Sequence, residues 1–189
     1  MLKLLYTCLR VFYKTAFKIE IEGAEKFPKD KAAVVIANHM SAHDPILLMG
    51  LFHGKISFMA KEELFKNKLF AWVLNKVGAF PVNRQGNDLK AIKHALKILK
   101  DNRILGIFPQ GTRMSSADAE QAKGGAAFLA IKTKTPIVPV AIKGNFKFGS
   151  KITVKVFDEY STENASLEKE EMERVSNEAF SVIANYLEA

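Results

Sequence analysis

Apolar and polar positions along the chain repeat with two periods, one typical of strands and one typical of helices. Short apolar runs and strict alternation predict strands at 17–21, 32–37, 56–59, 79–82, 104–108, 137–142 and 151–157. Apolar residues three or four positions apart predict helices at 45–52, 61–76, 88–100, 126–134 and 167–187. Because strands and helices interleave, we expect a single α/β domain with a mostly parallel central sheet flanked by helices.

Two of these helices have apolar faces that we expect to pack on the sheet. In segment 61–76 the inner face is predicted to consist of Leu64, Phe65, Leu69, Trp72 and Val73. In segment 88–100 the inner face is predicted to consist of Leu89, Ile92, Leu96 and Leu99. Both helices would then bury these side chains in the core of the domain.

Residues 1–18 form a predicted amphipathic helix. One face consists of Leu2, Leu5, Tyr6, Leu9, Phe12, Tyr13 and Ala16, and the opposite face consists of Lys3, Thr7, Arg10, Lys14 and Lys18. Leu4 and Val11 interrupt this pattern because they fall near the basic side. Such a helix either lies in a bilayer interface, with its lysines among phosphates, or packs on its own domain with a solvated basic stripe. Periodicity alone does not distinguish these two interpretations.

Length and composition are those of one folded domain. A chain of 189 residues buries about 70% of the surface of its unfolded form and needs no disulfide or metal. Cys8 is the single cysteine, which excludes an intramolecular disulfide and favours a reducing compartment such as the cytoplasm. No stretch approaches the roughly 18 consecutive apolar residues of a spanning helix, and the N-terminal segment is not typical of a secretory signal peptide.

The net charge of +8 predicts an anionic partner. Nucleic acid and anionic lipid headgroups both satisfy this requirement. The basic residues are spread over the chain, and the sequence has neither the aromatic–basic signature of an RNA-binding sheet nor zinc-finger spacing. A nucleic-acid-binding function would therefore rest on charge alone, and we expect no nucleic-acid partner.

The first group of candidate catalytic residues directly follows the predicted buried strand 32–37. It contains His39 and, five residues later, Asp44. The carboxyl ends of strands are where α/β sheets gather their ligands and catalytic groups. A histidine at this point is suited to act as a general base near neutral pH, with the carboxylate fixing its tautomer.

Three other interpretations of this segment are open. Asp44 precedes Pro45 and has the sequence of a helix N-cap, in which case His39 is only a loop histidine. His39, His43 and Asp44 could instead ligate a metal, although no further acidic or cysteine cluster completes such a site. Ser41 resembles a nucleophile, but its spacing from His39 is more typical of a turn hydroxyl.

Candidate anion-binding residues follow three other predicted strands. Gly111, Thr112 and Arg113 offer an open backbone, a hydroxyl and a planar guanidinium suited to phosphate. Arg84 and Lys61 each follow another strand. One cation at a strand end is ordinary, but three on the edge that carries a His–Asp pair indicate an anion site beside a base.

Four sequence motifs follow one another along the chain: Asn-His-x-Ser-x-x-Asp at 38–44, Gly-x-x-x-Val-x-Arg at 78–84, Phe-Pro-x-Gly-Thr-Arg at 108–113 and Val-Pro-Val at 138–140. In this order they resemble the motifs of the glycerolipid acyltransferase family, the 1-acyl-glycerol-3-phosphate acyltransferases. The resemblance implies transfer of an acyl group to the sn-2 hydroxyl of 1-acyl-glycerol-3-phosphate, which gives phosphatidic acid. The implied donor is a thioester of CoA or of acyl carrier protein, acting as co-substrate, and no cofactor is implied.

The same resemblance implies roles for individual residues. His39 corresponds to the general base for the acceptor hydroxyl, and Asp44 corresponds to the residue that orients it. Pro139 belongs to a motif associated with the acyl chain. The implied binding site for the acceptor phosphate consists of Lys61, Arg84, Gly111, Thr112 and Arg113.

Gln110 departs from the family, whose third motif usually has Glu at this position. Glutamine keeps an acceptor oxygen of nearly the same reach and loses the charge. We include Gln110 among the substrate-binding candidates and keep open an acyltransferase that acts on another lysophospholipid or hydroxylated lipid. A non-catalytic peripheral lipid-binding module is a further alternative, against which the presence of both His39 and Asp44 argues.

The implied lipid chemistry favours the interfacial interpretation of the N-terminus. We expect residues 1–18 to form an interfacial helix and residues 19–189 to form an acyltransferase domain. The expected location is the cytoplasmic face of the cell membrane, with peripheral attachment. The expected partners are an anionic membrane surface, a lysophospholipid, and acyl-CoA or acyl carrier protein.

Overall fold

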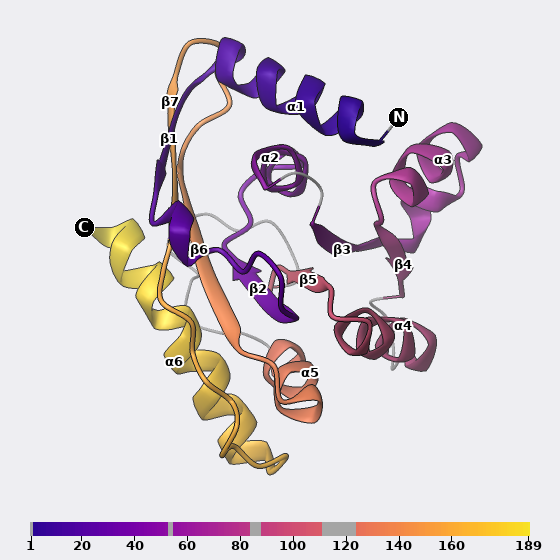
Figure 1. The fold of residues 1–189 in the computed structure, drawn as a ribbon, viewed down its shortest axis with the longest axis vertical. Helices are drawn as coiled ribbons and strands as arrows, with labels where there is room; N and C mark the ends of the chain where they lie inside the picture. The colour runs from indigo at the N-terminus through magenta and orange to yellow at the C-terminus, as the bar shows by residue number, and fades with distance from the viewer. Residues whose placement is uncertain (1, 53–54, 84–87, 111–123) are drawn as a thin grey trace.

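The described part of the chain forms a seven-stranded sheet with helices packed on it (Figure 1). The structure is a computed structural model, and it describes residues 2–52, 55–83, 88–110 and 124–189. The strands are β1 Lys18–Glu22, β2 Ala33–Ala37, β3 Ile56–Lys61, β4 Phe80–Val82, β5 Ile104–Ile107, β6 Ile137–Gly144 and β7 Lys151–Val156. Their spatial order is β1-β7-β6-β2-β5-β3-β4.

Strand β2 is the centre of this sheet, and every one of its residues is buried. It pairs in parallel with β5 on one side and with β6 on the other, and β3 and β4 continue the parallel part beyond β5. Strand β7 is antiparallel to β6, and β1 pairs in parallel with β7. The two strands β1 and β7 therefore run in the opposite direction to the other five. The predicted α/β domain with a mostly parallel central sheet is confirmed.

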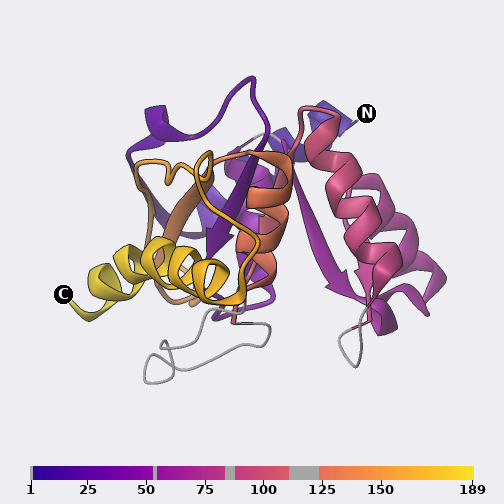
Figure 2. The same ribbon diagram turned by 90° about the horizontal axis from the view of Figure 1, so that it is seen from below.

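Helices cover both sides of the sheet. The described α-helices are α1 Leu2–Ala16, α2 His43–Leu51, α3 Lys68–Lys76, α4 Leu89–Lys100, α5 Gly125–Thr133 and α6 Lys169–Glu188. Figure 1 shows α1 and α2 on one side of the sheet and α5 and α6 on the other, and Figure 2 shows α4 at the end formed by β3 and β4. None of the helices in the described ranges is long and apolar enough to cross a membrane.

The apolar face that we expected for segment 61–76 is wrong. The segment forms a 3-10 helix, η2 Glu62–Phe65, and then α3, and it exposes Leu64, Leu69, Trp72 and Val73. The opposite side of α3 packs on the core through Leu74 and continues to the buried Val77. Because α3 has apolar residues on two sides, spacing alone does not tell which side is covered. Leu89 of α4 is likewise exposed rather than buried.

Helix α1 also has apolar residues on two sides. Tyr6, Tyr13 and Ala16 are buried in a core that α1 shares with α2. Leu4 and Phe12 are exposed, together with Val11. The helix therefore packs on its own domain through part of the predicted apolar face, and the exposed Leu4 and Val11 are the residues that interrupted this face in the sequence.

Asn38 extends the pairing of β2 and β6 beyond the last backbone pair. Its Nδ2 donates to the carbonyl of Ile142 at 2.9 Å, and its Oδ1 accepts from the Ile142 N–H at 2.8 Å. The side chain is buried, so both bonds are shielded from water. This contact fixes the chain directly before His39.

We expect Asn38→Ala to lower the free energy of unfolding by about 1–3 kcal/mol, because it leaves the buried N–H and C=O of Ile142 without these bonds. Chemical denaturation measures the loss. The matched control is Asn145→Ala, which removes an exposed side chain that accepts from the nearby Lys147 N–H in its own loop. Equal, small losses in both variants would contradict the importance of the Asn38 contact.

Candidate active site

The carboxyl ends of β2 and β5 bring together residues that are far apart in the sequence. Ile36 of β2 lies opposite Ile107 of β5. The residues that follow these strands are therefore neighbours at the same edge of the sheet. This edge holds His39 after β2 and Gln110 after β5.

His39 and Asp44 form the predicted pair. The His39 Nδ1 lies 3.0 Å from the Asp44 Oδ2. The His39 side chain is 13% exposed, whereas that of Asp44 is fully buried. A carboxylate accepts the Nδ1–H, which leaves the lone pair of Nε2 available to accept a proton. The pair is thus arranged for general-base chemistry.

Asp44 is more than a helix cap. Its Oδ2 accepts from the backbone N–H of Met40 and from that of Ser41, each at 2.7 Å, in addition to the imidazole of His39. Helix α2 begins at His43 and its N-cap is Ala42, which makes no side-chain capping bond. The interpretation of Asp44 as only an N-cap is therefore wrong. The carboxylate closes the loop back onto His39 from inside the first turn of α2.

The imidazole of His39 is held by a stack of rings. Its centroid lies 4.2 Å from that of Phe108, with 22° between the planes. Phe108 stacks in turn on Phe58 of β3, at 5.2 Å and 13°. A Cβ at Gly106, which pairs with Phe58, would collide with the Phe58 ring. A glycine at this position of β5 therefore leaves room for the stack.

Gln110 contacts the same loop through its amide oxygen. Its Oε1 accepts from the backbone N–H of His39 at 3.2 Å. This bond requires an acceptor oxygen and no negative charge. Glutamine therefore makes a bond that the glutamate implied by the family resemblance would also make.

Tyr13 of α1 contacts the first residue of α2, directly after the same loop. Its hydroxyl lies 3.0 Å from the Nδ1 of His43, whose ring stacks on Phe146 at 4.9 Å. Burial, and to a smaller extent the negative charge of Asp44, raises the pKa of Tyr13 to about 12. The hydroxyl therefore stays protonated at neutral pH and remains a hydrogen-bond donor. No sequence pattern indicated this contact, because it joins two elements through tertiary packing.

His43 and Ser41 have local partners that explain their presence. The Ser41 hydroxyl accepts from the His43 backbone N–H at 3.2 Å, so it is the turn hydroxyl that its spacing predicted. Within the described ranges, no group of three His, Cys, Asp or Glu side chains is placed to hold a metal ion.

The predicted phosphate-binding residues are described only in part. Lys61 ends β3 at the same edge of the sheet, where its exposed ammonium pairs with Glu63 at 3.1 Å. Arg84, Gly111, Thr112 and Arg113 lie outside the described residues. Pro139 is buried within β6, opposite Ile36. The structure thus brings together His39, Asp44 and Gln110.

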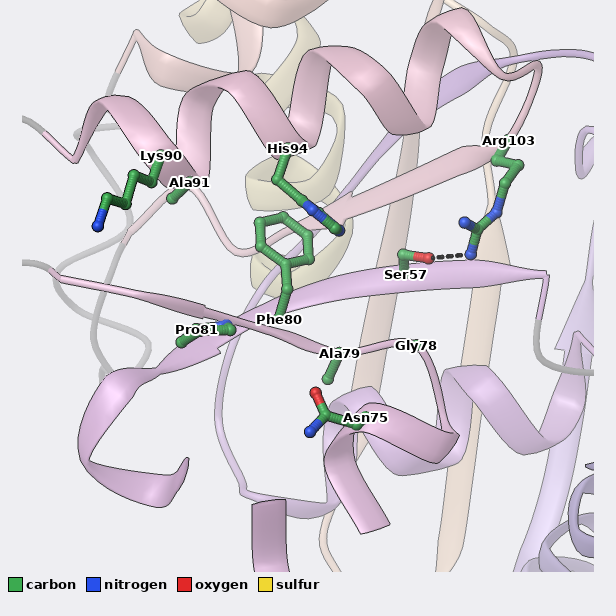
Figure 3. Close-up of a pocket in the computed structure, with 10 residues that line it drawn as sticks. All are labelled: Ser57, Asn75, Gly78, Ala79, Phe80, Pro81, Lys90, Ala91, His94 and Arg103. Atoms are coloured by element: carbon green, nitrogen blue, oxygen red, sulfur yellow. Dashed lines mark hydrogen bonds between the residues drawn. The ribbon is translucent and has the colours of Figure 1, made fainter. Parts of the chain in front are cut away.

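A pocket of about 370 Å³ lies beside α4 and β4 (Figure 3). Arg103 donates to the Ser57 hydroxyl at 2.9 Å at one end of it, and Lys90 lies at the other end. Neither His39 nor Asp44 lines this pocket. We therefore place the candidate chemistry at the strand ends. The lining residues are Ser57, Asn75, Gly78, Ala79, Phe80, Pro81, Lys90, Ala91, His94 and Arg103.

Known proteins are similar to this chain over most of its length. A family model described as Acyltransferase matches residues 18–143. A protein of Bacillus subtilis named 1-acyl-sn-glycerol-3-phosphate acyltransferase is 37% identical over 145 residues, which cover 76% of this chain and 72% of the Bacillus protein. Proteins of the same name from Borreliella burgdorferi and Streptococcus pneumoniae are 31% and 37% identical and align with 75% and 65% of this chain.

The fold has a counterpart of known structure. The crystal structure of the 1-acyl-sn-glycerophosphate (LPA) acyltransferase PlsC from Thermotoga maritima matches with a TM-score of 0.76 and 27% identity. The match covers 99% of this chain and 80% of the Thermotoga chain. The aligned regions cover 58% of the Borreliella protein and 46% of the Streptococcus protein.

The raised pKa of Tyr13 predicts an alkaline loss of stability. Because the folded state holds this proton more tightly than a tyrosine with the ordinary pKa of 10.0, the contribution is complete below pH 10 and is lost as the pH rises to about 12. Between pH 10 and about 12 the unfolding free energy of both proteins should fall. The fall should be about 2 kcal/mol smaller for Tyr13→Phe than for the unmodified protein.

Urea denaturation at a series of pH values measures this difference. At neutral pH the variant should be less stable by about 1 kcal/mol, because the bond to His43 is lost. The control is Tyr186→Phe, on α6, which should retain most of the alkaline loss. An alkaline loss in Tyr13→Phe as large as in the unmodified protein would contradict the assignment.

Proposed function

The chain belongs to the acyltransferase family, and on that premise we propose that it transfers a fatty acyl group to the sn-2 hydroxyl of 1-acyl-glycerol-3-phosphate. The product is phosphatidic acid. The acyl donor is a thioester of CoA or of acyl carrier protein. The names of the relatives support this acceptor, and the arrangement of His39 and Asp44 supports this chemistry.

The observation that carries the proposal is the single contact between the His39 Nδ1 and the buried Asp44 carboxylate. It fixes the tautomer that leaves Nε2 basic, at an imidazole that is partly exposed at the edge of the sheet. A general base in this position suits a reaction in which a hydroxyl must lose its proton as it attacks.

In the proposed reaction the acceptor oxygen attacks the thioester carbonyl while Nε2 of His39 takes the hydroxyl proton. Backbone N–H groups stabilise the oxyanion that forms. The C–S bond then breaks, and the imidazolium returns its proton to the departing sulfur, which leaves as a free thiol. Since the acceptor attacks the donor directly, no protein nucleophile is required, and Ser41 takes no covalent part.

The phosphate of the acceptor is proposed to bind Lys61, Arg84 and Arg113, with Gly111 and Thr112 contributing backbone and hydroxyl contacts. Lys61 lies at the same edge of the sheet as His39, which supports its part in this site. A guanidinium binds phosphate through two parallel hydrogen bonds, so the two arginines are suited to this role.

We further propose that the protein binds peripherally to the cytoplasmic face of the cell membrane through α1. The support for this location is the exposed apolar side of α1, with Leu4, Val11 and Phe12, beside the basic Lys14. Apolar side chains enter the acyl region of a bilayer while neighbouring lysines contact anionic headgroups. In such a position the candidate site could take up its lysolipid acceptor directly from the membrane.

His39→Ala should lower acyl transfer by about 10²–10⁴-fold, which is the usual contribution of general-base assistance. The assay is thiol release from a long-chain acyl-CoA in detergent micelles, with and without 1-acyl-glycerol-3-phosphate. The matched control is His94→Ala, which removes an exposed imidazole from α4 and should retain activity. Release that needs neither the lysolipid nor His39 would contradict the proposed reaction.

Gln110→Glu should retain activity within about threefold, because a carboxylate oxygen accepts the His39 N–H as the amide oxygen does. Gln110→Leu should lower kcat about fivefold to tenfold, because the loop before the base loses one hydrogen bond. Steady-state kinetics on both variants test this pair. Full activity in Gln110→Leu would show that the bond to His39 has no role in turnover.

A further inference from the structure

Helix α3 presents an apolar stripe to the outside of the molecule. Leu69, Trp72 and Val73 occupy positions i, i+3 and i+4 and are 71%, 56% and 41% exposed. Leu64 of η2 adds a fourth exposed apolar side chain. Isolated exposed apolar residues are ordinary, but a helical stripe that contains a tryptophan marks an interaction surface.

The charge around this stripe is positive. Residues 66–76 contain Lys66, Lys68 and Lys76 and no acidic residue. The ammonium of Lys76 lies 5.9 Å from the centre of the Trp72 ring. The preceding η2 has two glutamates, of which Glu63 is paired with Lys61 and Glu62 accepts from the side-chain amide of Asn83. An apolar stripe flanked by lysines is complementary to an anionic, partly apolar surface.

Helix α3 lies next to α1, the helix for which we have proposed membrane contact. The hydroxyl of Tyr6 on α1 lies 3.5 Å from the carbonyl of Val77, directly after α3. Figure 1 shows α3 near the N-terminal end of α1. The exposed apolar residues of the two helices therefore belong to neighbouring parts of the molecule.

We propose that the stripe of Leu69, Trp72 and Val73 is a second membrane-contact surface, which enters the headgroup boundary of an anionic bilayer beside α1. Leucine and valine side chains gain from leaving water, and the indole of tryptophan favours the boundary between headgroups and acyl chains. Lys68 and Lys76 belong to α3 and Lys66 lies just before it, so their ammonium groups would contact headgroup phosphates. This second surface adds to the membrane contact that we propose for α1, and it does not depend on the proposed reaction.

An acidic carrier protein is the main alternative occupant of this surface. Lysine side chains alone would suffice to bind such a protein electrostatically. Binding of that kind would not explain why leucine, tryptophan and valine side chains are exposed beside the lysines. The composition of the stripe therefore favours lipid. The two occupants give different results in the experiment below.

Trp72 is the single tryptophan of the chain and reports directly on this surface. The full-length protein is mixed with vesicles of phosphatidylcholine and phosphatidylglycerol, some carrying brominated acyl chains. We expect the emission of Trp72 to shift to shorter wavelength and to be quenched by the brominated lipid. Co-sedimentation with the vesicles without any shift or quenching would overturn the proposal, as would a shift induced only by acyl carrier protein.

Paired variants test the stripe by a second measurement. Leu69→Gln combined with Val73→Gln should weaken partitioning into the vesicles by about tenfold. The matched control combines Leu89→Gln on α4 with Val182→Gln on α6, both exposed and on the other side of the sheet, and should bind as the unmodified protein does. An equal loss in both double variants, or no loss in the first, would overturn the proposal.

Acyl transfer to a water-soluble, short-chain lysolipid separates this inference from the reaction. The Leu69→Gln, Val73→Gln variant should transfer the acyl group to this acceptor at the unmodified rate, because the stripe lies outside the site of chemistry. Activity lost with the soluble acceptor as well as with vesicles would overturn the assignment of the stripe to membrane contact. A protein that binds vesicles through Trp72 and never transfers an acyl group would refute the proposed reaction alone.

Discussion

The geometry of the candidate site depends on one buried carboxylate oxygen. The Oδ2 of Asp44 accepts from two backbone N–H groups and from the imidazole of His39, while its partner Oδ1 is buried without a hydrogen bond among the described residues. A buried charge needs such donors to offset the loss of water. The same three bonds that stabilise the carboxylate also close the loop and orient the base, so the position of His39 follows from the requirement to satisfy Asp44.

The sheet supports this loop through two separate contacts. Asn38 binds the backbone of β6 on one side of β2, and the stack of Phe58, Phe108 and His39 extends over β5 and β3 on the other. A loop residue is normally more mobile than the strand before it. Here the base is fixed by packing on its ring face, by a hydrogen bond at Nδ1 and by a bond from its backbone N–H to Gln110. Such support is what general-base catalysis requires of a preorganised imidazole.

The sequence could predict the parts of this arrangement that are local. Apolar runs such as 32–37 identified the buried strands, and the spacing of His39 and Asp44 identified the pair, because both signals extend over a few residues. The contacts of Tyr13 and Gln110 could not be predicted, since each joins segments that only the fold brings together. The prediction of the buried face of α3 was wrong for a related reason. Periodicity shows that a helix side is apolar, but it does not show whether protein or another phase covers that side.

Helix α1 joins the proposed lipid contact to the catalytic loop. Its inner side contributes Tyr6 and Tyr13 to the core, and the Tyr13 hydroxyl bonds to His43, the neighbour of Asp44. Undocking α1 would expose these rings and remove that bond, so the helix is expected to stay on the domain when its outer side meets lipid. A helix is about 10 Å across. The base would then lie within reach of a lysolipid that remains anchored in the membrane by its acyl chain, which explains why one helix would serve both packing and binding.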